Sequence, residues 1–409
     1  MQFKLPDMRK AIPAILAFIV SVSLSAQPDL RRLAESSSIN NPVIPGAWRT
    51  EEYFPLLKAK HVGVVANQTS LIREVHLVDS LLSAGITVVK VFTPEHGFRG
   101  NAEAGASIGN DWDSRSGLPL ISLYGDRKKP GKAELEGLDI VIFDLQDVGA
   151  RFYTYISTMT YMMEACAENN IPLILLDRPN PNGFYVDGPV LKPEFSSFVG
   201  LHPVPVVHGM TMTEYARMVN GERWLKNGAE CNLTWVPCKG YTHKSRYRLP
   251  VRPSPNLPDM ASVYLYPSLC FFEGTVVSVG RGTKSPFTVI GHPDFTYGSH
   301  VFRPVQIKGV SENPPHKGVD CYGYNLRERS DEIYENGGLR LEWLVEMYKA
   351  LGSKPGFFNN FFDKLAGTDE LRRQIQAGVS EIKIRESWET GLQKFKEIRN
   401  KYLLYPDFE

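Results

Sequence analysis

Short, nearly continuous hydrophobic runs alternate with amphipathic segments after a loop-like stretch that ends at Pro45. The hydrophobic runs predict four strands, at residues 61–66, 86–92, 138–144 and 171–177. Runs of this kind are typical of a parallel sheet whose two faces are both covered by helices. The amphipathic segments predict helices at residues 72–84, 154–169 and 213–220. This alternation favours an α/β fold with a doubly wound parallel sheet.

The pattern changes near Arg252, where prolines and glycines begin to cluster as far as Pro293. The stretch 301–325 suits strands of a smaller antiparallel unit. Helices are predicted further on, at residues 339–351, 368–377 and 387–403. The length of 409 residues also favours two domains over one. We therefore expect a sheet domain over residues 45–255 and an auxiliary α+β domain over residues 256–409.

The first 26 residues have the pattern of a secretory signal peptide. Basic residues precede an apolar run from Ala11 to Leu24, and a small residue, Ala26, stands before the expected cleavage point. The run is short for a membrane span, although a buried first helix is the alternative. No cysteine stands at the cleavage point to carry a lipid anchor. We expect an exported protein, periplasmic or extracellular, without stable membrane insertion after cleavage.

Composition narrows the class of partner. A net charge of +1, with 43% hydrophobic and 22% charged residues, offers no field to attract nucleic acid. The five cysteines show no metal-binding spacing, and no His-Glu-x-x-His motif occurs, so we predict neither metal nor cofactor. Cys231 and Cys238 are close enough in sequence to bridge, but buried free thiols are the favoured interpretation.

Polar residues gather where the four predicted strands end. These segments are residues 67–70, 93–100, 144–153 and 177–183. Because ligands of open α/β sheets bind beyond the carboxyl ends of the strands, these segments predict the site. Helix capping is the alternative for Asn67, Asp177 and Asn182. Glutamate is a poor cap, so Glu95 is the strongest functional candidate.

Three common chemistries lack their motifs. No glycine-rich turn follows the first strand, and no Gly-Lys-Ser/Thr loop occurs, which argues against dinucleotide and P-loop binding. No Gly-x-Ser-x-Gly elbow follows a predicted strand, so no activated serine is available for His208 to act on as a base. His208 is equally compatible with contact to substrate and with a structural role.

Carboxylate chemistry remains. Glycoside hydrolysis needs a protonated carboxyl and a second group that assists at the anomeric carbon. Glu95 suits the first role, because neighbouring Phe92 and Phe98 would desolvate it and raise its pKa. Candidates for the second are Asp144, Asp147, Glu103 and Glu273. Inverting, retaining and acetamido-assisted mechanisms are all compatible with the sequence. The alternative for Glu273 is a structural position at the rim of an aromatic core.

Taken together, the motifs resemble those of the NamZ-type exo-β-N-acetylmuramidases. The resemblance runs from about Pro45 to the C-terminus and is carried by segments 67–70, 94–100, 144–155, 177–181 and 272–283. It implies a Rossmann-like catalytic domain, a smaller auxiliary domain and a cleft between them. It also implies release of terminal N-acetylmuramic acid from the non-reducing ends of peptidoglycan fragments, with Glu95 as the main catalytic residue.

The lactyl carboxylate of muramic acid calls for a positioned arginine, because guanidinium binds carboxylate in bidentate fashion. For Arg178, the alternative to binding this carboxylate is an ion pair with Asp144 or Asp177. We predict Glu95, Asp144 and Glu273 as catalytic. The predicted substrate-binding residues are Asn67, His96, Arg99, Gln146, Asp147, Arg151, Tyr153, Arg178, Asn180, His208 and Arg281. The rival hypothesis is a non-catalytic exported protein that binds cell-wall fragments.

Overall fold

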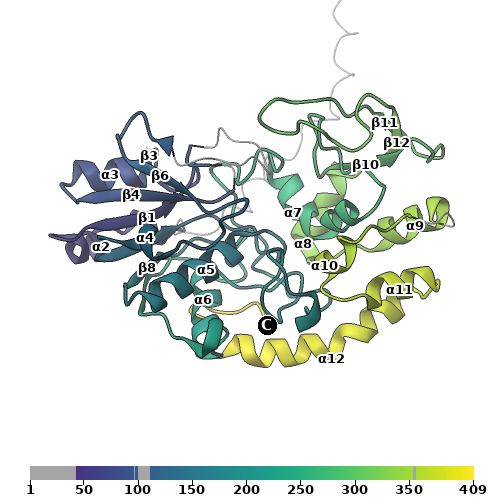
Figure 1. The fold of residues 1–409 in the computed structure, drawn as a ribbon. Helices are drawn as coiled ribbons and strands as arrows, with labels where there is room; N and C mark the ends of the chain where they lie inside the picture. The colour runs from purple at the N-terminus through teal and green to yellow at the C-terminus, as the bar shows by residue number, and fades with distance from the viewer. Residues whose placement is uncertain (1–42, 96, 100–110, 353–355) are drawn as a thin grey trace, which may run out of the picture. The chain divides into compact units, whose positions relative to one another are not determined.

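A seven-stranded sheet forms the first half of the folded chain (Figure 1). The computed structural model describes residues 43–95, 97–99, 111–352 and 356–409. The order across the sheet is β5-β6-β4-β1-β7-β8-β9, and β5 runs antiparallel to its neighbour β6. In chain order the strands are β1 (Val62–Ala66), β4 (Val88–Thr93), β5 (Asp111–Trp112), β6 (Pro119–Ser122), β7 (Ile140–Asp144), β8 (Leu173–Leu176) and β9 (Leu233–Val236). The other six strands are parallel in a Rossmann-like order, which confirms the predicted fold class.

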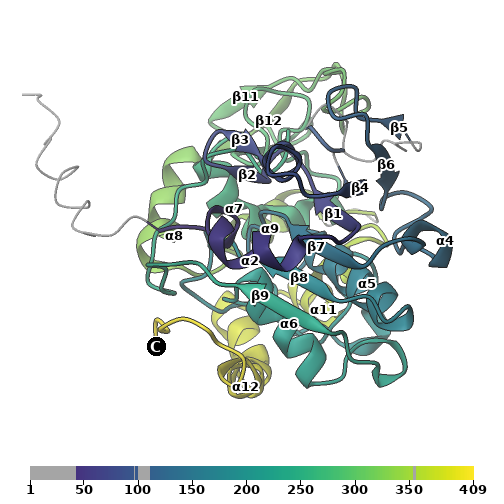
Figure 2. The same ribbon diagram turned by 90° about the vertical axis from the view of Figure 1, so that its left-hand side faces the viewer.

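Alternate residues of the central strands enter two different cores. Val64 of β1 packs with α2 (Thr50–Leu57) and α3 (Leu77–Ser83), and α2 lies in front of the sheet in Figure 2. Val65 packs with helices on the opposite face, which are α4 (Lys132–Leu135), α5 (Tyr155–Glu168) and α6 (Met212–Gly221). Both faces are therefore buried, which explains why the strands are hydrophobic at nearly every position.

The four strands predicted from hydrophobic runs are present within two residues of their expected ends. The helix expected at residues 72–84 is shorter than predicted. A small hairpin of β2 (Leu71–Ile72) and β3 (Val75–His76) replaces its first turn. The His76 ring then accepts a hydrogen bond from the Val78 N–H, so α3 begins only at Leu77.

The second half of the chain combines a small sheet with helices, as predicted. Strands β10 (Val289–His292), β12 (Cys321–Asn325) and β11 (His300–Phe302) pair antiparallel in that order. The helices are α7 (Met260–Leu269), α8 (Ser330–Asn336), α9 (Glu342–Leu351), α10 (Phe362–Ala366), α11 (Glu370–Gln376) and α12 (Glu381–Asn400). Single 3₁₀ turns are η1 (Gly46–Trp48), η2 (Pro193–Phe195), η3 (Lys226–Gly228), η4 (Cys270–Gly274) and η5 (Arg327–Arg329).

The C-terminal segment after α12 returns to the parallel sheet (Figure 1). The Tyr405 hydroxyl donates a hydrogen bond to Asp177 just after β8, at 2.5 Å, and the Leu404 N–H donates to Glu214 at 2.8 Å. Residues 43–409 accordingly form one folded unit. The five cysteines are all buried and free, as favoured from the sequence. Within the described ranges, no helix is both long and apolar enough to cross a membrane, and the predicted signal peptide lies outside those ranges.

Candidate active site

A cavity beyond the carboxyl end of β4 contains Glu95, and we name it the Glu95 cavity. Glu95 comes from the loop that follows β4, and the opposite wall comes from α7 and the segments around residues 254–257 and 281–287. The lining residues are Glu95, Phe152, Tyr153, Thr154, Tyr155, Ser254, Asn256, Leu257, Tyr266, Arg281 and Phe287. Both halves of the chain therefore contribute to the cavity.

The Glu95 carboxyl is held by hydroxyl groups and largely withdrawn from water. The Thr154 hydroxyl donates to its Oε2 at 3.4 Å, and the Tyr124 hydroxyl also forms a hydrogen bond with the carboxyl. Burial raises the pKa of Glu95, although the Arg281 charge and both hydroxyl groups act in the opposite direction. A carboxyl with a raised pKa keeps its proton to higher pH, which is what a general acid requires.

Arg281 occupies a tight turn between two glycines. Gly280 and Gly282 have φ values of +76° and +78°, and a Cβ atom on Gly282 would lie 2.4 Å from the Val305 carbonyl oxygen. Only glycine fits both positions without strain. The Arg281 guanidinium lies 5.1 Å from the centre of the Phe287 ring. The turn thus fixes where the arginine side chain enters the cavity.

Glu273 of η4 engages this arginine. Arg281 Nε donates to Glu273 Oε1, and the Cys270 thiol donates to Oε2 at 3.6 Å. Glu273 raises the pKa of Glu95 by charge repulsion, a smaller effect than burial, so the two carboxyls are close enough to interact. Among the described residues, Glu273 alone is bonded to the Arg281 side chain. The two terminal nitrogens of Arg281 are therefore available to a ligand.

Asp144 and Arg178 form a second ion pair, away from the Glu95 cavity. The contacts are bidentate, with Nε–Oδ1 at 2.5 Å and Nη2–Oδ2 at 2.8 Å. The two side chains are 0% and 4% exposed. This is the arrangement that the sequence offered as the alternative for Arg178. The structure gives Asp144 a bound arginine rather than a place beside Glu95.

Asn67 lies behind the cavity and acts on it through Tyr155. Its Nδ2 donates to the Tyr155 hydroxyl at 2.7 Å, while its Oδ1 accepts from the Thr69 N–H and hydroxyl. Tyr155 lines the cavity, as does the predicted binding residue Tyr153. Asn67 therefore positions a cavity residue, and Thr69 fixes which way the Asn67 amide points.

Gln146 and Asp147 follow β7 and are buried. Gln146 Nε2 donates to the Asp147 and Pro179 carbonyl oxygens, at 2.9 and 2.8 Å. Asp147 Oδ2 accepts from the Gly149 N–H at 2.8 Å, and burial raises the pKa of Asp147 to about 7. These contacts hold the loop after β7, and neither residue contributes to the lining of the Glu95 cavity.

Two of the predicted arginines are engaged elsewhere. Arg99 pairs with Asp113 through two bonds of 2.8 Å and also contacts Asp79. Arg151 is fully buried, and its hydrogen bonds to the described part of the chain all go to backbone oxygens, those of Pro189, Val204 and Leu365. Its bond to Leu365 joins the loop after β7 to α10. Arg151 thus links the two halves of the chain rather than facing the cavity.

Asn180 and His208 are also part of the packed interior. Asn180 Nδ2 donates to the Met210 carbonyl at 2.8 Å, and its Oδ1 caps the Asn182 N–H. His208 Nδ1 accepts from the Met210 N–H, and burial lowers the pKa of His208 to about 3. His208 is a buried residue and is not among the residues that line the Glu95 cavity. His96, the remaining predicted residue, and Glu103 lie outside the described residues.

Several residues that line the Glu95 cavity or interact with Glu95 were not predicted as site residues. Tyr124 follows β6, a four-residue strand that the hydrophobic pattern did not reveal. Thr154 stands within a recognised segment but resembles an ordinary helix-capping residue. Asn256 and Phe287 come from the proline- and glycine-rich region, where no strand end marks a site. The sequence marked the site by dense groups of polar residues at the ends of predicted strands. These residues do not stand out as members of such a group.

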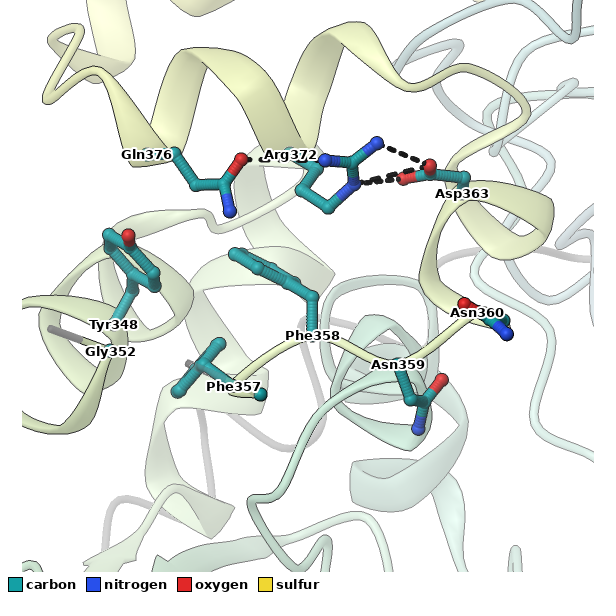
Figure 3. A pocket seen from close by; sticks show the side chains of 10 residues that line it. Tyr348, Gly352, Phe357, Phe358, Asn359, Asn360, Asp363, Arg372 and Gln376 are labelled. Carbon is teal, nitrogen blue, oxygen red and sulfur yellow. Dashed lines mark hydrogen bonds and ion pairs between the residues drawn. The ribbon is translucent and has the colours of Figure 1, made fainter. Parts of the chain in front are cut away.

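A second pocket, which we name the Phe358 pocket, lies between α9, α10 and α11 (Figure 3). Its lining residues are Tyr348, Gly352, Gly356, Phe357, Phe358, Asn359, Asn360, Asp363, Arg372 and Gln376. Arg372 is bound by Asp363, and the Tyr348 and Phe358 rings stack on each other at 5.4 Å. Its two charged side chains, Asp363 and Arg372, pair with each other, and none of the predicted site residues lines this pocket. The chemistry therefore belongs to the Glu95 cavity.

No cluster of three or more histidine, cysteine or acidic side chains suited to a metal occurs in the described part of the chain. An α/β fold that places a carboxyl of raised pKa beside an arginine in a cavity is typical of an enzyme that works by proton transfer. Fold and site thus define an α/β protein with a cavity whose carboxyl and arginine suit acid–base chemistry.

Comparison with known proteins specifies the family. Residues 62–261 match the model "Exo-beta-N-acetylmuramidase NamZ, N-terminal", and residues 264–405 match the corresponding C-terminal model. The chain belongs to the NamZ exo-β-N-acetylmuramidase family. It is 38% identical, over 97% of its length and 100% of the relative, to the peptidoglycan β-N-acetylmuramidase NamZ of Bacillus subtilis (strain 168).

Two crystal structures of DUF1343 family proteins from Bacteroides fragilis NCTC 9343 share the fold. One is 47% identical with a TM-score of 0.83, covering 90% of this chain and 100% of that one. The other is 28% identical with a TM-score of 0.73, covering 89% and 99%. The family predicted from the sequence motifs is thereby confirmed.

Proposed function

We propose that this protein is an exo-β-N-acetylmuramidase that releases terminal N-acetylmuramic acid from the non-reducing ends of peptidoglycan fragments. Membership of the NamZ family and the likeness to the peptidoglycan β-N-acetylmuramidase of Bacillus subtilis support the reaction class. The single structural observation that carries the proposal is the position of Glu95, a half-buried carboxyl of raised pKa in a cavity beside Arg281. The predicted signal peptide supports an exported, periplasmic or extracellular location.

Glu95 acts as the proton donor. Its protonated carboxyl gives a proton to the glycosidic oxygen while the bond between that oxygen and the anomeric carbon breaks. Water supplies the hydroxyl that the anomeric carbon gains, and the proton that the water loses restores the acid. Tyr124 and Thr154 hold the carboxyl by hydrogen bonds, so its orientation does not depend on the substrate. Burial keeps the proton in place, because the charged form is poorly solvated there.

Arg281 recognises the lactyl carboxylate of the muramic acid. Its two terminal nitrogens are free of described partners and lie in the lining of the cavity, where a carboxylate is bound in bidentate fashion. Glu273 orients this guanidinium through Nε, so we assign Glu273 to positioning. The same pairing distinguishes muramic acid from N-acetylglucosamine, which lacks the lactyl group.

Product analysis tests the proposal. The purified protein is incubated with a disaccharide of N-acetylmuramic acid β-linked to N-acetylglucosamine, and the products are identified by mass spectrometry. We expect both free monosaccharides. A matched disaccharide with N-acetylglucosamine at the non-reducing end is the control and should be cleaved at least about 100-fold more slowly, as expected for loss of a charged hydrogen-bonded contact. Tight binding without product would support the non-catalytic binding protein and overturn the proposal.

A further inference from the structure

Asn256 places a buried amide in the wall of the Glu95 cavity. The residue is 2% exposed and lines the same cavity as Glu95 and Arg281. Its Oδ1 is buried and has no hydrogen-bond partner among the described residues. An unpaired buried acceptor is costly, because the group has lost its water without gaining a donor. Such an oxygen in a cavity wall is suited to accept a hydrogen bond from a ligand.

The orientation of the Asn256 amide follows from its neighbour. The Asn256 Nδ2 donates to the Val310 carbonyl oxygen at 3.2 Å. A carbonyl oxygen accepts and cannot donate, so the NH₂ group of the amide must face Val310. Oδ1 is consequently the atom left unpaired, and rotation of the amide would place two acceptors against each other. Asn256 therefore presents an acceptor that cannot turn into a donor.

The backbone that carries Asn256 is held from both sides. The Pro253 carbonyl oxygen accepts from the Tyr153 hydroxyl at 2.9 Å and from Gln68 Nε2 at 3.1 Å. The Asn256 N–H donates to the Ser254 hydroxyl at 3.2 Å. Contacts from the sheet domain thus fix the segment on one side, while Val310 fixes the side chain on the other. Such a support gives the amide the fixed geometry that discrimination between ligands requires.

The chemistry of the sugar indicates which group meets this acceptor. A sugar hydroxyl both donates and accepts, so it binds next to acceptors and donors alike. The acetamido N–H at C2 can only donate. Arg281 supplies donors to the same cavity, whereas Asn256 Oδ1 is a fixed neutral acceptor. A fixed acceptor rejects a ligand without the matching donor, because its own desolvation then stays uncompensated.

We propose that Asn256 is a specificity-determining residue whose Oδ1 accepts a hydrogen bond from the acetamido N–H of the substrate. The proposal rests on the proposed function and names the substrate group read by this wall of the cavity. It assigns N-acetyl recognition to Asn256 and lactyl recognition to Arg281. The N-acetyl sugar is then selected over an analogue of the same shape that lacks the N–H.

Two aryl β-glycosides of muramic acid test the proposal. One carries the 2-acetamido group, and the other carries a 2-acetoxy group, in which an ester oxygen replaces the N–H. The ratio of their kcat/KM values is measured for the wild type, Asn256→Leu and Asn256→Asp. Any effect of the ester on the chemistry itself is common to all three proteins. Comparison of the ratios therefore isolates the contact at Asn256.

The wild type should prefer the acetamido substrate, and Asn256→Leu should reduce that preference by about 10- to 100-fold, the effect of one buried hydrogen bond. Asn256→Asp keeps an acceptor but loses the donor to Val310, so it should retain the preference within about threefold. Thermal unfolding confirms that each variant is folded, and Asn256→Ala, which also removes the acceptor, replaces Asn256→Leu if the leucine variant fails to fold.

An unchanged preference in Asn256→Leu would overturn the proposal. Equal loss of preference in Asn256→Asp would also overturn it, because the bond to Val310 would then be the feature that matters. In both cases the wild type still releases N-acetylmuramic acid. Absence of sugar release by the wild type from either glycoside is a different result, since it overturns the proposed function and this inference with it.

Discussion

Two arginine–carboxylate pairs lie near the strand ends of this protein and differ in what they leave free. In the Arg178–Asp144 pair, two bonds join the side chains and both are almost fully buried. In the Arg281–Glu273 pair, Nε is the one guanidinium atom bonded to another described residue, and the side chains are 25% and 22% exposed. In the Arg178–Asp144 pair, each side chain is bonded to the other through two atoms. In the Arg281–Glu273 pair, the two terminal nitrogens of Arg281 remain available to a ligand in the Glu95 cavity.

The difference separates a contribution to stability from a contribution to function. A buried bidentate pair stabilises the fold only while both partners are present, because either one alone is an uncompensated charge. A guanidinium bonded through Nε keeps its orientation and still offers two donors to a carboxylate. The same residue types therefore serve different purposes, and mutation of each pair should affect a different measurement.

The largest effect is expected from breaking the buried pair. Asp144→Ala leaves the Arg178 charge buried without a partner, so it should lower the free energy of unfolding by about 3–5 kcal/mol. Chemical denaturation measures this loss. The matched control is Asp320→Ala, which breaks an equally bidentate but exposed pair with Arg303 and should cost less than about 1 kcal/mol. Equal losses in the two variants would contradict the role given to Asp144.

Removal of the second guanidinium should affect activity instead. Arg281→Met should lower kcat/KM for an N-acetylmuramic acid glycoside by about 100-fold, because a charged bond to the lactyl group is lost. The matched N-acetylglucosamine glycoside should change less than about threefold. Arg372→Met, in the Phe358 pocket, is the control and should leave both rates unchanged. A uniform loss on both substrates would show that Arg281 does not recognise the lactyl group.

A smaller effect concerns pH. Burial raises the pKa of Glu95, and the protonated form is the active one, so activity is present at low pH and falls as pH rises through that raised pKa. Arg281 lowers the same pKa. Arg281→Met should therefore move the basic limb of the kcat/KM profile to higher pH. A shift to lower pH, or none, would contradict the proximity of Arg281 to the Glu95 carboxyl.

The central strands of the sheet were predictable because a local pattern of hydrophobic residues is enough to identify them. Strands buried on both faces are hydrophobic at nearly every position, so β1, β4, β7 and β8 are visible in the sequence. The place of Glu95 beyond the carboxyl end of β4 was predictable for a related reason, because its loop directly follows a buried strand. Strands β6 and β9 are as short as β8, but both are partly exposed and each includes a polar residue, Ser122 or Thr234, so neither forms a continuous hydrophobic run.

The rest of the site depends on contacts between distant residues. Arg178 and Asp144 are 34 residues apart, and the sequence left Asp144, Asp177 and a substrate carboxylate all open as partners of Arg178. Arg151 bonds to Leu365, which lies 214 residues further along the chain. Asn256 is inconspicuous in a proline-rich loop, and its importance appears only when Val310 fixes the direction of its amide. Sequence pattern thus indicates which residues are polar at a strand end, but not which of them are already engaged.

The central claim is that Glu95 donates the proton, and Glu95→Gln tests it most directly. Glutamine has nearly the same shape and cannot give up a proton, so kcat for an N-acetylmuramic acid glycoside with a poor leaving group should fall by about 10²- to 10⁴-fold. The thermal unfolding midpoint should stay near that of the wild type, which shows that the fold is intact. Turnover by the folded variant within about tenfold of the wild type would contradict the account.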